Sequence, residues 1–295
     1  MMKRNVSERG RKILVLGCGA LGGTLIDRFS PCADVTVVDP SPRVSVKKHI
    51  FHSVDGIKGR SFDGLIVATK CYDLDKSLIP LRKSVFIKRI LFLQNGILNL
   101  ARVPQLFPKA AIVRGVTTSA FGISSRRAFF YYQGEFFLAP YDDKMNEAVS
   151  WFGRLLADAG FKTSIVSTSS RIVWAKLIFS AVMNPLPVMT GQRYDVLKKD
   201  QEIWKLVKQA VNEGRAVAKA LRVRLAFDPL RLIDRVRNGD LAGIKHRGSI
   251  IQDIKVGCST ELDFITGALI RHARKVGVKT PALDLILLRA KEAGA

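Results

Sequence analysis

Leu16-Gly17-Cys18-Gly19-Ala20-Leu21-Gly22 is the stretch that decides the fold of this chain. It stands between residues 12–16, an apolar run typical of a buried strand, and a helical pattern over residues 20–29. In that setting a Gly-x-Gly-x-x-Gly string predicts a loop for a dinucleotide pyrophosphate, because glycines permit a tight turn, close approach of backbone amides and close helix packing. The N-terminus of the helix then faces the phosphates. We therefore expect Gly17, Cys18, Gly19, Ala20, Leu21 and Gly22 to bind a nicotinamide dinucleotide; the alternative is a glycine-rich turn of another α/β fold.

Asp39 bears on which dinucleotide is bound. It ends the second expected strand, residues 35–38. An acidic side chain there, about 20 residues past the loop, accepts hydrogen bonds from the ribose hydroxyls and repels a 2′-phosphate. Asp39 therefore favours NADH. Arg43, Lys47 and Lys48 follow closely and can neutralise a 2′-phosphate, so NADPH is not excluded.

The first half of the chain continues as an α/β pattern. Near-continuous apolar runs, typical of parallel strands covered on both faces, occur at residues 64–68, 90–93 and 111–115. Alternation over residues 129–138, with Gly134 between two aromatic runs, predicts an antiparallel hairpin at the sheet edge. A helix at residues 147–159, closed by Gly160, and a strand at 163–166 complete this part.

After Thr168 the periodicity is helical. The expected helices span residues 170–183, 201–220, 229–236, 249–256, 260–276 and 281–290. We therefore predict an α/β fold class, an N-terminal Rossmann doubly wound sheet followed by an all-helical C-terminal domain. The expected boundaries are 1–11 for a disordered basic lead-in, 12–168 for the dinucleotide-binding Rossmann domain and 169–295 for the helical substrate and catalytic domain.

The composition indicates a cytoplasmic globular protein with an unusual charge. The 295 residues carry a formal net charge of +23. The lysines and arginines are spread along the sequence and not gathered with stacking aromatics, so we expect small anionic ligands and no specific nucleic-acid partner. The apolar runs are far shorter than the ~20 residues of a membrane span, and residues 1–11 lack a secretory signal. The four cysteines lack C-x-x-C spacing and predict neither a metal site nor a disulfide framework.

A lysine within an apolar helix is the first candidate for acid chemistry. The chain has only four histidines, so the histidine acid of many dehydrogenases is poorly supplied. Lys176 lies in the expected helix 170–183, and Ser180 and Asn184 follow at steps of four, so all three share one helix face. This polar stripe predicts a substrate site. The alternative is an amphipathic helix with one solvated edge.

A carboxylate at the start of a helix is the second candidate. Ser259 and Thr260 are good helix caps, which places Glu261 in the first turn of the next helix. The helix dipole there favours the ionised carboxylate. The alternative is a glutamate that only stabilises the dipole.

Taken together, these segments resemble the ketopantoate reductase (2-dehydropantoate 2-reductase) family. The matching motifs, in the family's order, are the glycine loop, Ala68-Thr69-Lys70, Gln94-Asn95-Gly96, residues 174–186, residues 249–254 and Thr260-Glu261-Leu262-Asp263. The resemblance implies an enzyme with a Rossmann domain, a helical domain and a substrate cleft between them. It also implies NAD(P)H-dependent reduction of ketopantoate to pantoate, on the route to pantothenate and coenzyme A.

The resemblance also implies roles for individual residues. Lys176 matches the general acid, and Glu261 matches the acid that hydrogen-bonds the substrate hydroxyls. Asn184 and Ser249 match residues that bind the substrate. Asn95 and Lys70 match residues that line the nicotinamide and substrate end of the cleft. Hydride delivered to the ketone carbon leaves an alkoxide, which a desolvated ammonium can protonate. Burial is expected to lower the pKa of Lys176, and a nearby Glu261 to hold it up.

Two positions depart from the family pattern. Ser180 stands where the family often carries a second asparagine, and Asp39-Pro40 where NADPH-using members usually place an arginine. One alternative is therefore a reductase of the same architecture acting on another small 2-keto or 3-hydroxy acid. Another is a non-catalytic, dinucleotide-responsive binding protein. The sequence leaves a homodimer open.

Overall fold

The computed structural model describes residues 10–239, 249–255 and 257–295. Most of the expected lead-in, residues 1–9, and Val256 of the expected helix 249–256 lie outside the described residues. Contacts between Cα atoms divide the chain into two compact units. The first unit comprises Met1–Gln94 with Asn99–Ser169, and the second comprises Asn95–Leu98 with Ser170–Ala295.

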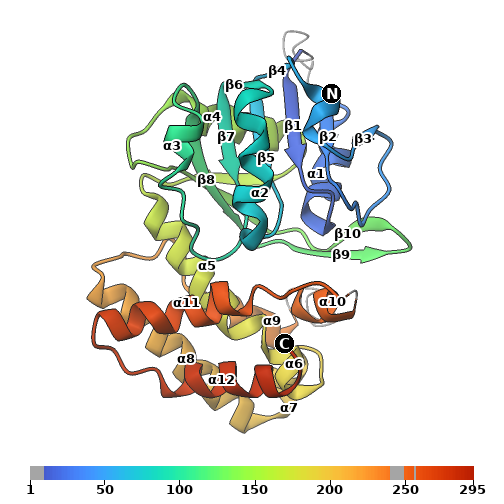
Figure 1. Ribbon diagram of the computed structural model, residues 1–295. Helices are drawn as coiled ribbons and strands as arrows, with labels where there is room; N and C mark the ends of the chain where they lie inside the picture. The colour runs from blue at the N-terminus through green and yellow to red at the C-terminus, as the bar shows by residue number, and fades with distance from the viewer. Residues whose placement is uncertain (1–9, 240–248, 256) are drawn as a thin grey trace, which may run out of the picture. The chain divides into compact units, whose positions relative to one another are not determined.

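The first unit is built on an eight-stranded sheet in the order β12-β11-β8-β7-β5-β1-β2-β3 (Figure 1). The strands are β1 (Lys12–Leu16), β2 (Asp34–Val38), β3 (Ile50–Phe51), β5 (Gly64–Val67), β7 (Arg89–Phe92), β8 (Ala111–Thr117), β11 (Glu135–Pro140) and β12 (Lys162–Ile165). All neighbours pair in parallel except β11 and β8. From β1 the chain builds outward to β2 and then, on the other side, to β5, so the strand order reverses between β1 and β5. This is a doubly wound sheet, as expected.

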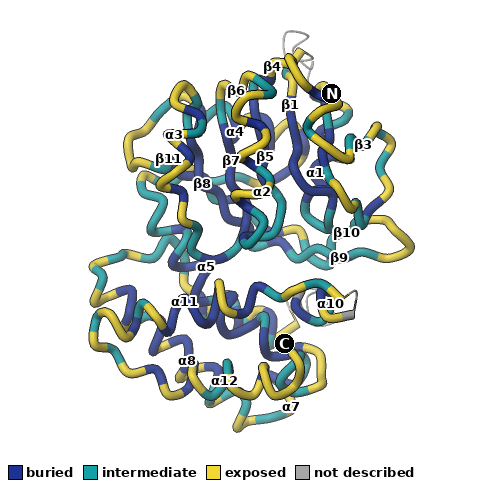
Figure 2. The backbone as a smooth tube through the Cα atoms, viewed as in Figure 1, coloured by how far each residue is buried: buried dark blue, intermediate teal, exposed yellow. Residues whose placement is uncertain are grey.

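Buried strands and helices form the core of this unit. Every residue of β5 is buried, and so are four of the five in β1 (Figure 2). The helices are α1 (Ala20–Phe29), α2 (Leu74–Leu78), α3 (Val103–Leu106) and α4 (Glu147–Asp158), with 3-10 turns at Val54–Ile57, Cys71–Asp73 and Pro80–Lys83. A small parallel sheet pairs β4 (Ser61–Phe62) with β6 (Phe86–Ile87). In the core the ring of Phe161 contacts those of Phe29 and Phe136 at 6.5 and 5.0 Å between centroids.

The expected hairpin over residues 129–138 is wrong. β10 (Arg127–Tyr132) pairs antiparallel with β9 (Ala120–Ser124) in a separate two-stranded sheet, and β11 joins the main sheet. The chain turns between β9 and β10 at Ser125 and Arg126, whose φ angles are 48° and 57°. Such a two-residue turn usually carries Asn-Gly or a similar pair, and its absence hid this hairpin from the sequence.

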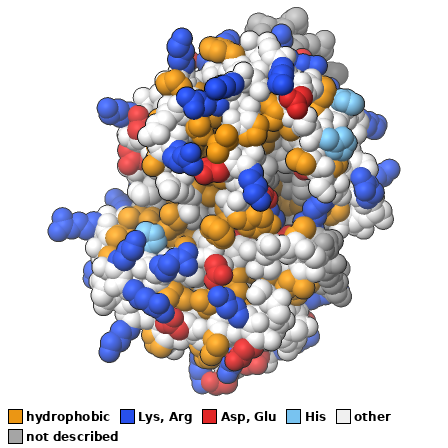
Figure 3. Space-filling model, viewed as in Figure 1, with side chains coloured by type: hydrophobic (Ala, Val, Ile, Leu, Met, Phe, Trp, Pro, Cys, Tyr) orange, Lys and Arg blue, Asp and Glu red, His pale blue; other side chains and the backbone are white. Residues whose placement is uncertain are grey.

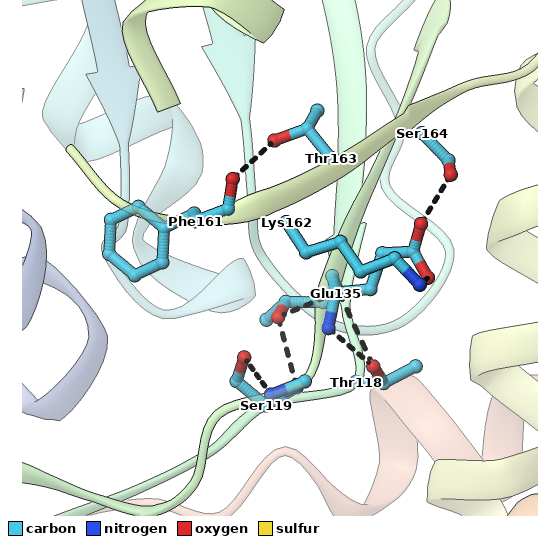
Figure 4. Close-up of polar contacts among 9 residues, drawn as sticks. Thr118, Ser119, Glu135, Phe161, Lys162, Thr163 and Ser164 are labelled. Atoms are coloured by element: carbon cyan, nitrogen blue, oxygen red, sulfur yellow. Dashed lines mark hydrogen bonds and ion pairs between the residues drawn. The ribbon is translucent and has the colours of Figure 1, made fainter. Parts of the chain in front are cut away.

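Hydrogen bonds to Thr118 and Ser119, just beyond β8, fix Gly134 and Glu135 at the start of β11. Gly134 N–H donates to Ser119 Oγ (3.0 Å). Glu135 N–H donates to Thr118 Oγ1 (2.9 Å), as Figure 4 shows. A Cβ on Gly134 would lie 2.4 Å from Thr118 Oγ1. The Glu135 carboxylate also accepts a hydrogen bond from Ser164 of β12. Gly134 therefore permits a close approach and does not form the turn of a hairpin.

Arg11 was expected within the disordered lead-in, but the structure holds it in place. Its guanidinium forms an ion pair with Asp158 (2.6 Å). It also lies 5.9 Å from the ring centroid of Trp151. Arg11, the last residue of the expected lead-in, is therefore anchored to the first unit.

The second unit is helical in its described residues. Its helices are α5 (Ser169–Met183), α6 (Leu186–Thr190), α7 (Val196–Lys199), α8 (Gln201–Ala220), α9 (Pro229–Asn238), α10 (Ser249–Lys255), α11 (Leu262–Lys275) and α12 (Pro281–Glu292). α8 packs closely on α5, because a Cβ on Gly214 would lie 2.9 Å from Ile178. The carboxylate of Glu213 accepts the backbone N–H groups of Ala282 and Leu283, both at 2.9 Å, and so caps α12.

One described segment, Ser169–Thr190, is long and apolar enough to cross a membrane by length and composition alone. An 18-residue stretch within it has a mean hydropathy of 1.5, and 67% of that stretch is buried inside the protein. That burial is the property of a core helix, which agrees with the packing of α5 against α8.

Candidate active site

The glycine loop joins β1 to α1 in the way that its sequence indicates. Gly17 has a φ of 95°, and a Cβ there would lie 2.9 Å from the backbone of Ala68 and Thr69. A Cβ on Gly22 would lie 2.0 Å from the carbonyl oxygen of Gly17. Gly19, in contrast, is the N-cap of α1, and a Cβ there would meet no described atom within 4 Å. The loop is therefore tightly packed except at the helix N-terminus, where it is open, as a pyrophosphate site requires.

Asp39 lies beside this loop, at the end of β2. Its carboxylate accepts the backbone N–H of Cys18 (2.5 Å) and that of Ser41 (2.8 Å). Arg43 N–H donates to the carbonyl of Cys18 (3.2 Å). Asp39 thus also braces the glycine loop, in addition to standing where a ribose-binding acid is expected.

Sequence reasoning missed one cation near this segment, Arg126 in the turn between β9 and β10. Its Nε donates to Ser45 Oγ (3.1 Å), and Ser45 N–H donates to the carbonyl of Arg126 (2.8 Å). These two bonds fix the turn against the loop that follows Asp39. The two residues are 81 positions apart in the sequence, so no local pattern could have placed Arg126 here.

Cys18 is a packed thiol within the loop. Its side chain is fully buried, and Sγ donates to the carbonyl of Val44 (3.4 Å). Burial, followed by the charge of Asp39, raises the pKa of Cys18 to about 11. The thiol is therefore protonated at neutral pH and unsuited to nucleophilic chemistry.

Lys176 lies on α5 with its side chain half-buried. Its Nζ is 4.9 Å from the ring centroid of Phe179. Burial lowers the pKa of Lys176 to about 8. The lowering by burial that the sequence predicts is therefore confirmed. The Lys176 side chain can therefore exchange a proton near physiological pH.

Ser180 and Asn184 follow Lys176 along the same helix face. Ser180 is 1% exposed, and its Oγ has no hydrogen-bond partner among the described residues. Asn184 N–H donates to the carbonyl of Ser180 (3.0 Å) and so extends the helical bonding beyond Met183. The burial of Ser180 argues against the alternative of a solvated edge.

Glu261 is the N-cap residue of α11, one position before the expected first turn. Its side chain does not cap the helix, while its carbonyl accepts the N–H groups of Phe264 (3.1 Å) and Ile265 (3.0 Å). Glu261 is 6% exposed. Thr266 Oγ1, on α11, donates to the carbonyl of Ala181, on α5 (2.9 Å). The helix that follows Glu261 is therefore bonded directly to the helix that carries Lys176.

Asn95 belongs by its contacts to the second unit, although the sequence places it after β7. Its neighbour Gly96 has a φ of 81°, and a Cβ there would lie 2.7 Å from the carbonyl oxygen of Phe264. Asn95 is therefore adjacent to a residue that contacts the first turn of α11. Among the remaining candidates, Ser249 is the first residue of α10, and Lys70 lies in the first unit, directly before a 3-10 turn.

Sequence reasoning also missed Arg114, a buried arginine in β8. It is 3% exposed, and its guanidinium donates to the carbonyls of Phe92 (3.2 Å) and Gln94 (2.7 Å). Burial lowers its pKa to about 10, which leaves it charged at neutral pH. The signal was an arginine within an otherwise apolar strand, since arginine is seldom buried without a specific role.

His49, His52 and His272 lie within the described residues, whereas His246 lies outside them. His49 and His52 are exposed. His272 packs edge-to-face on Trp174 at 5.3 Å between centroids, and burial, with Lys275 and Arg271, lowers its pKa. Within the described ranges, no group of three or more His, Cys, Asp or Glu side chains is arranged to hold a metal ion. On the face drawn in Figure 3, Lys and Arg side chains are dispersed and do not form one continuous stripe.

Comparisons with known proteins identify the family of this chain. The family model "Ketopantoate reductase PanE/ApbA" matches residues 13–142, and the model of the C-terminal part of the same family matches residues 169–292. The 2-dehydropantoate 2-reductase of Pyrococcus horikoshii is 25% identical over 95% of this chain and 97% of its own length. That of Archaeoglobus fulgidus is 24% identical over 92% and 93%.

Solved structures share the fold. D-mandelate dehydrogenase, in a ternary structure with NADH and anilino(oxo)acetate, has a TM-score of 0.81 at 22% identity, covering 96% of this chain and 98% of its own. A dimeric ketopantoate reductase from Staphylococcus aureus has a TM-score of 0.74 at 20% identity, with coverage of 96% and 98%. Since the two family models together span most of the sequence, the chain belongs to the ketopantoate reductase PanE/ApbA family and is an NAD(P)-dependent oxidoreductase.

Proposed function

We propose that this enzyme reduces 2-dehydropantoate to pantoate, as a cytoplasmic step of pantothenate and coenzyme A biosynthesis. The observation that carries the proposal is Lys176, whose pKa is lowered to about 8, on one helix face with the buried hydroxyl of Ser180, which has no hydrogen-bond partner among the described residues. The nearly full-length match to relatives named 2-dehydropantoate 2-reductase supports this substrate. We assign cofactor binding to residues 12–168 and substrate binding with catalysis to residues 169–295.

In the proposed reaction the bound cofactor supplies hydride to the ketone carbon. Lys176, protonated below its pKa, donates a proton to the ketone oxygen as negative charge develops there. Glu261 accepts a hydrogen bond from the substrate hydroxyl, and its buried position strengthens that bond. The remaining site residues orient the substrate or line the nicotinamide end: Asn184, Ser180, Ser249, Asn95 and Lys70.

Ser180 also supports a second candidate function. A buried hydroxyl without a partner costs about 1–3 kcal/mol, which a polar group of the substrate can offset. A serine is smaller than the asparagine that the family often carries, so it leaves more room beside Lys176. This favours, as the second candidate, reduction of a bulkier 2-keto acid. The fold similarity to D-mandelate dehydrogenase is consistent with that alternative.

A steady-state assay distinguishes these two functions. We expect kcat/KM for ketopantoate to exceed that for phenylglyoxylate, pyruvate and 2-ketoisovalerate by at least about tenfold, because only ketopantoate combines a 2-keto acid with a hydroxyl for Glu261. The purified enzyme is assayed with each acid and saturating cofactor. A preference for phenylglyoxylate would instead support the second candidate, and turnover of none of the acids would contradict both.

We propose NADH as the preferred cofactor, with Asp39 as the selecting residue. Replacing Asp39 with asparagine removes the charge that repels a 2′-phosphate, while the amide oxygen can still accept the N–H of Cys18. We therefore expect the ratio of kcat/KM with NADPH to that with NADH to rise about tenfold, equivalent to roughly 1.4 kcal/mol. Asp34→Asn, an exposed position at the other end of β2, is the control. An unchanged ratio in Asp39→Asn would show that another residue selects the cofactor.

The oligomeric state is part of the same proposal. The fold neighbour from S. aureus is described as dimeric. We infer a homodimer for this chain as well, and light scattering of the purified enzyme, with and without cofactor, measures it directly.

A further inference from the structure

Three neighbouring strands of the first unit end in a network that the proposed reaction does not use. β1, β5 and β7 are adjacent in the sheet, and Gly17, Thr69 and Gln94 lie just beyond their carboxyl ends. A Cβ on Gly17 would lie 2.9 Å from Thr69 N. Gln94 Nε2 donates to Thr69 Oγ1 (3.2 Å). The glycine loop, Thr69 and Gln94 are therefore successive neighbours along one edge of the sheet.

Gln94 is held from two directions. Arg114 Nη2 donates to the backbone carbonyl of Gln94 (2.7 Å), while Nη1 donates to the carbonyl of Phe92 (3.2 Å). The side chain is held separately, through Nε2, by Thr69. Because both its main chain and its amide nitrogen are bonded, the amide oxygen of Gln94 has a defined position.

That amide oxygen has no hydrogen-bond donor in the part of the chain that the structure describes. Gln94 is 4% exposed, and its Oε1 has no hydrogen-bond partner among the residues described. A buried polar atom left in this state costs about 1–3 kcal/mol, and such atoms are rare in folded proteins. A fixed, buried acceptor at the carboxyl edge of the sheet points to a ligand that brings a donor.

The position of the oxygen indicates which part of the cofactor supplies that donor. In a doubly wound sheet the dinucleotide lies across the carboxyl ends of the strands where their order reverses, here between β1 and β5. Asp39, at the end of β2, is on the adenosine side of that point. β5 and β7 are on the opposite side, which is the nicotinamide side. The nicotinamide ring carries a primary carboxamide, whose NH₂ group is a hydrogen-bond donor.

We propose that Gln94 Oε1 accepts a hydrogen bond from the carboxamide NH₂ of the nicotinamide ring. Gln94 then acts as a recognition residue that distinguishes the nicotinamide half of the cofactor and fixes the rotation of its ring. Arg114 and Thr69 are positioning residues, since they act through Gln94. The inference rests on the dinucleotide binding of the proposed function and is independent of which keto acid is reduced.

Binding of three probes to the full-length enzyme tests the inference without any substrate. NAD⁺ carries the carboxamide, 3-acetylpyridine adenine dinucleotide carries a methyl group where the carboxamide has NH₂, and ADP-ribose lacks the ring altogether. Titration calorimetry measures each affinity for wild type and for Gln94→Met, which has similar volume but no acceptor. We expect Gln94→Met to bind NAD⁺ about 5–10-fold more weakly, as for loss of one hydrogen bond. Its affinities for the acetylpyridine analogue and for ADP-ribose are expected to match wild type.

The other outcomes are equally informative. Gln105→Met, at an exposed position of α3, is the matched control and is expected to bind all three probes like wild type. An unchanged NAD⁺ affinity in Gln94→Met would overturn the inference. Equal weakening of NAD⁺ and the acetylpyridine analogue would overturn the acceptor role of Oε1. Failure of the wild-type enzyme to bind any of the three probes would overturn the cofactor site itself, and this inference with it.

Discussion

A Lys176→Met variant is expected to lose about 10²–10⁴-fold in kcat while binding NADH as tightly as wild type. A positioned general acid typically contributes a factor of that size. Methionine has a similar length and no ionisable group, so it removes the proton and preserves the packing of α5. The measurements are single-turnover NADH oxidation with the preferred keto acid and NADH binding by fluorescence. A loss in kcat below threefold would contradict the assignment of Lys176.

The same variant is expected to change the pH profile. Lys176 has to be protonated to act as an acid, and its pKa is lowered to about 8. In wild type, kcat/KM for reduction is therefore expected to fall as pH rises through about 8, approaching tenfold per pH unit. The residual activity of Lys176→Met is expected to lack this fall. Lys219→Met, at an exposed position near the end of α8, should keep both the wild-type rate and the wild-type profile.

Stability is expected to move in the opposite direction to activity. The native pKa of Lys176, about 8, lies below the ordinary value of 10.5, so the native state binds this proton less readily than the unfolded state does. The charged lysine therefore destabilises the fold below pH 8, and that penalty disappears as the pH rises from 8 to 10.5. At pH 7 Lys176→Met is expected to raise the free energy of unfolding by up to about 3 kcal/mol. Such a gain would show that the fold gives up stability to keep an acid in the site.

The sequence could predict this fold well wherever the signal is local. The glycine loop, the apolar strands and the helix that precedes Gly160 each depend on a few neighbouring residues. The prediction of a hairpin over residues 129–138 was wrong because β10 pairs with β9. The turn that joins these two strands, at Ser125 and Arg126, contains no glycine or asparagine. Gly134 and Glu135 form hydrogen bonds with Ser119 and Thr118, just beyond β8, where β11 joins the main sheet. No local periodicity in the sequence predicts these hydrogen bonds.

In the candidate site, too, the sequence predicts local arrangements and does not predict long-range ones. Lys176, Ser180 and Asn184 could be grouped from the sequence, because a helix repeat alone puts them on one face. Gln94 could not be singled out, since its environment depends on Thr69, just beyond β5, and on Arg114 in β8, which are 25 and 20 residues away in the sequence. An arginine within an apolar strand indicates that its guanidinium forms a hydrogen bond in the core, but it does not identify the acceptor. The orphaned oxygen of Gln94 becomes visible only when the three strands are assembled.

Gly19 and Gly22, the last two glycines of the binding loop, are expected to respond to alanine in opposite ways. In Gly22→Ala the new Cβ would lie 2.0 Å from the carbonyl oxygen of Gly17, so α1 has to move away from the loop. Overpacking of this severity costs about 3 kcal/mol, which corresponds to a fall in Tm of about 6–12 °C. In Gly19→Ala the Cβ would meet no described atom within 4 Å, and the backbone, at φ −88° and ψ −159°, is open to alanine.

Gly19→Ala is therefore expected to keep the wild-type Tm within about 3 °C and to lose dinucleotide affinity by about a hundredfold, since its methyl group occupies the space of the pyrophosphate. Calorimetric titration with NADH and a thermal melt of each variant without ligand separate the two effects. Each variant is the control for the other, because both make the same chemical change three residues apart. Wild-type affinity in Gly19→Ala would mean that the pyrophosphate does not approach this loop. A wild-type Tm in Gly22→Ala would mean that the packing of α1 on the loop is looser than the 2.0 Å approach implies.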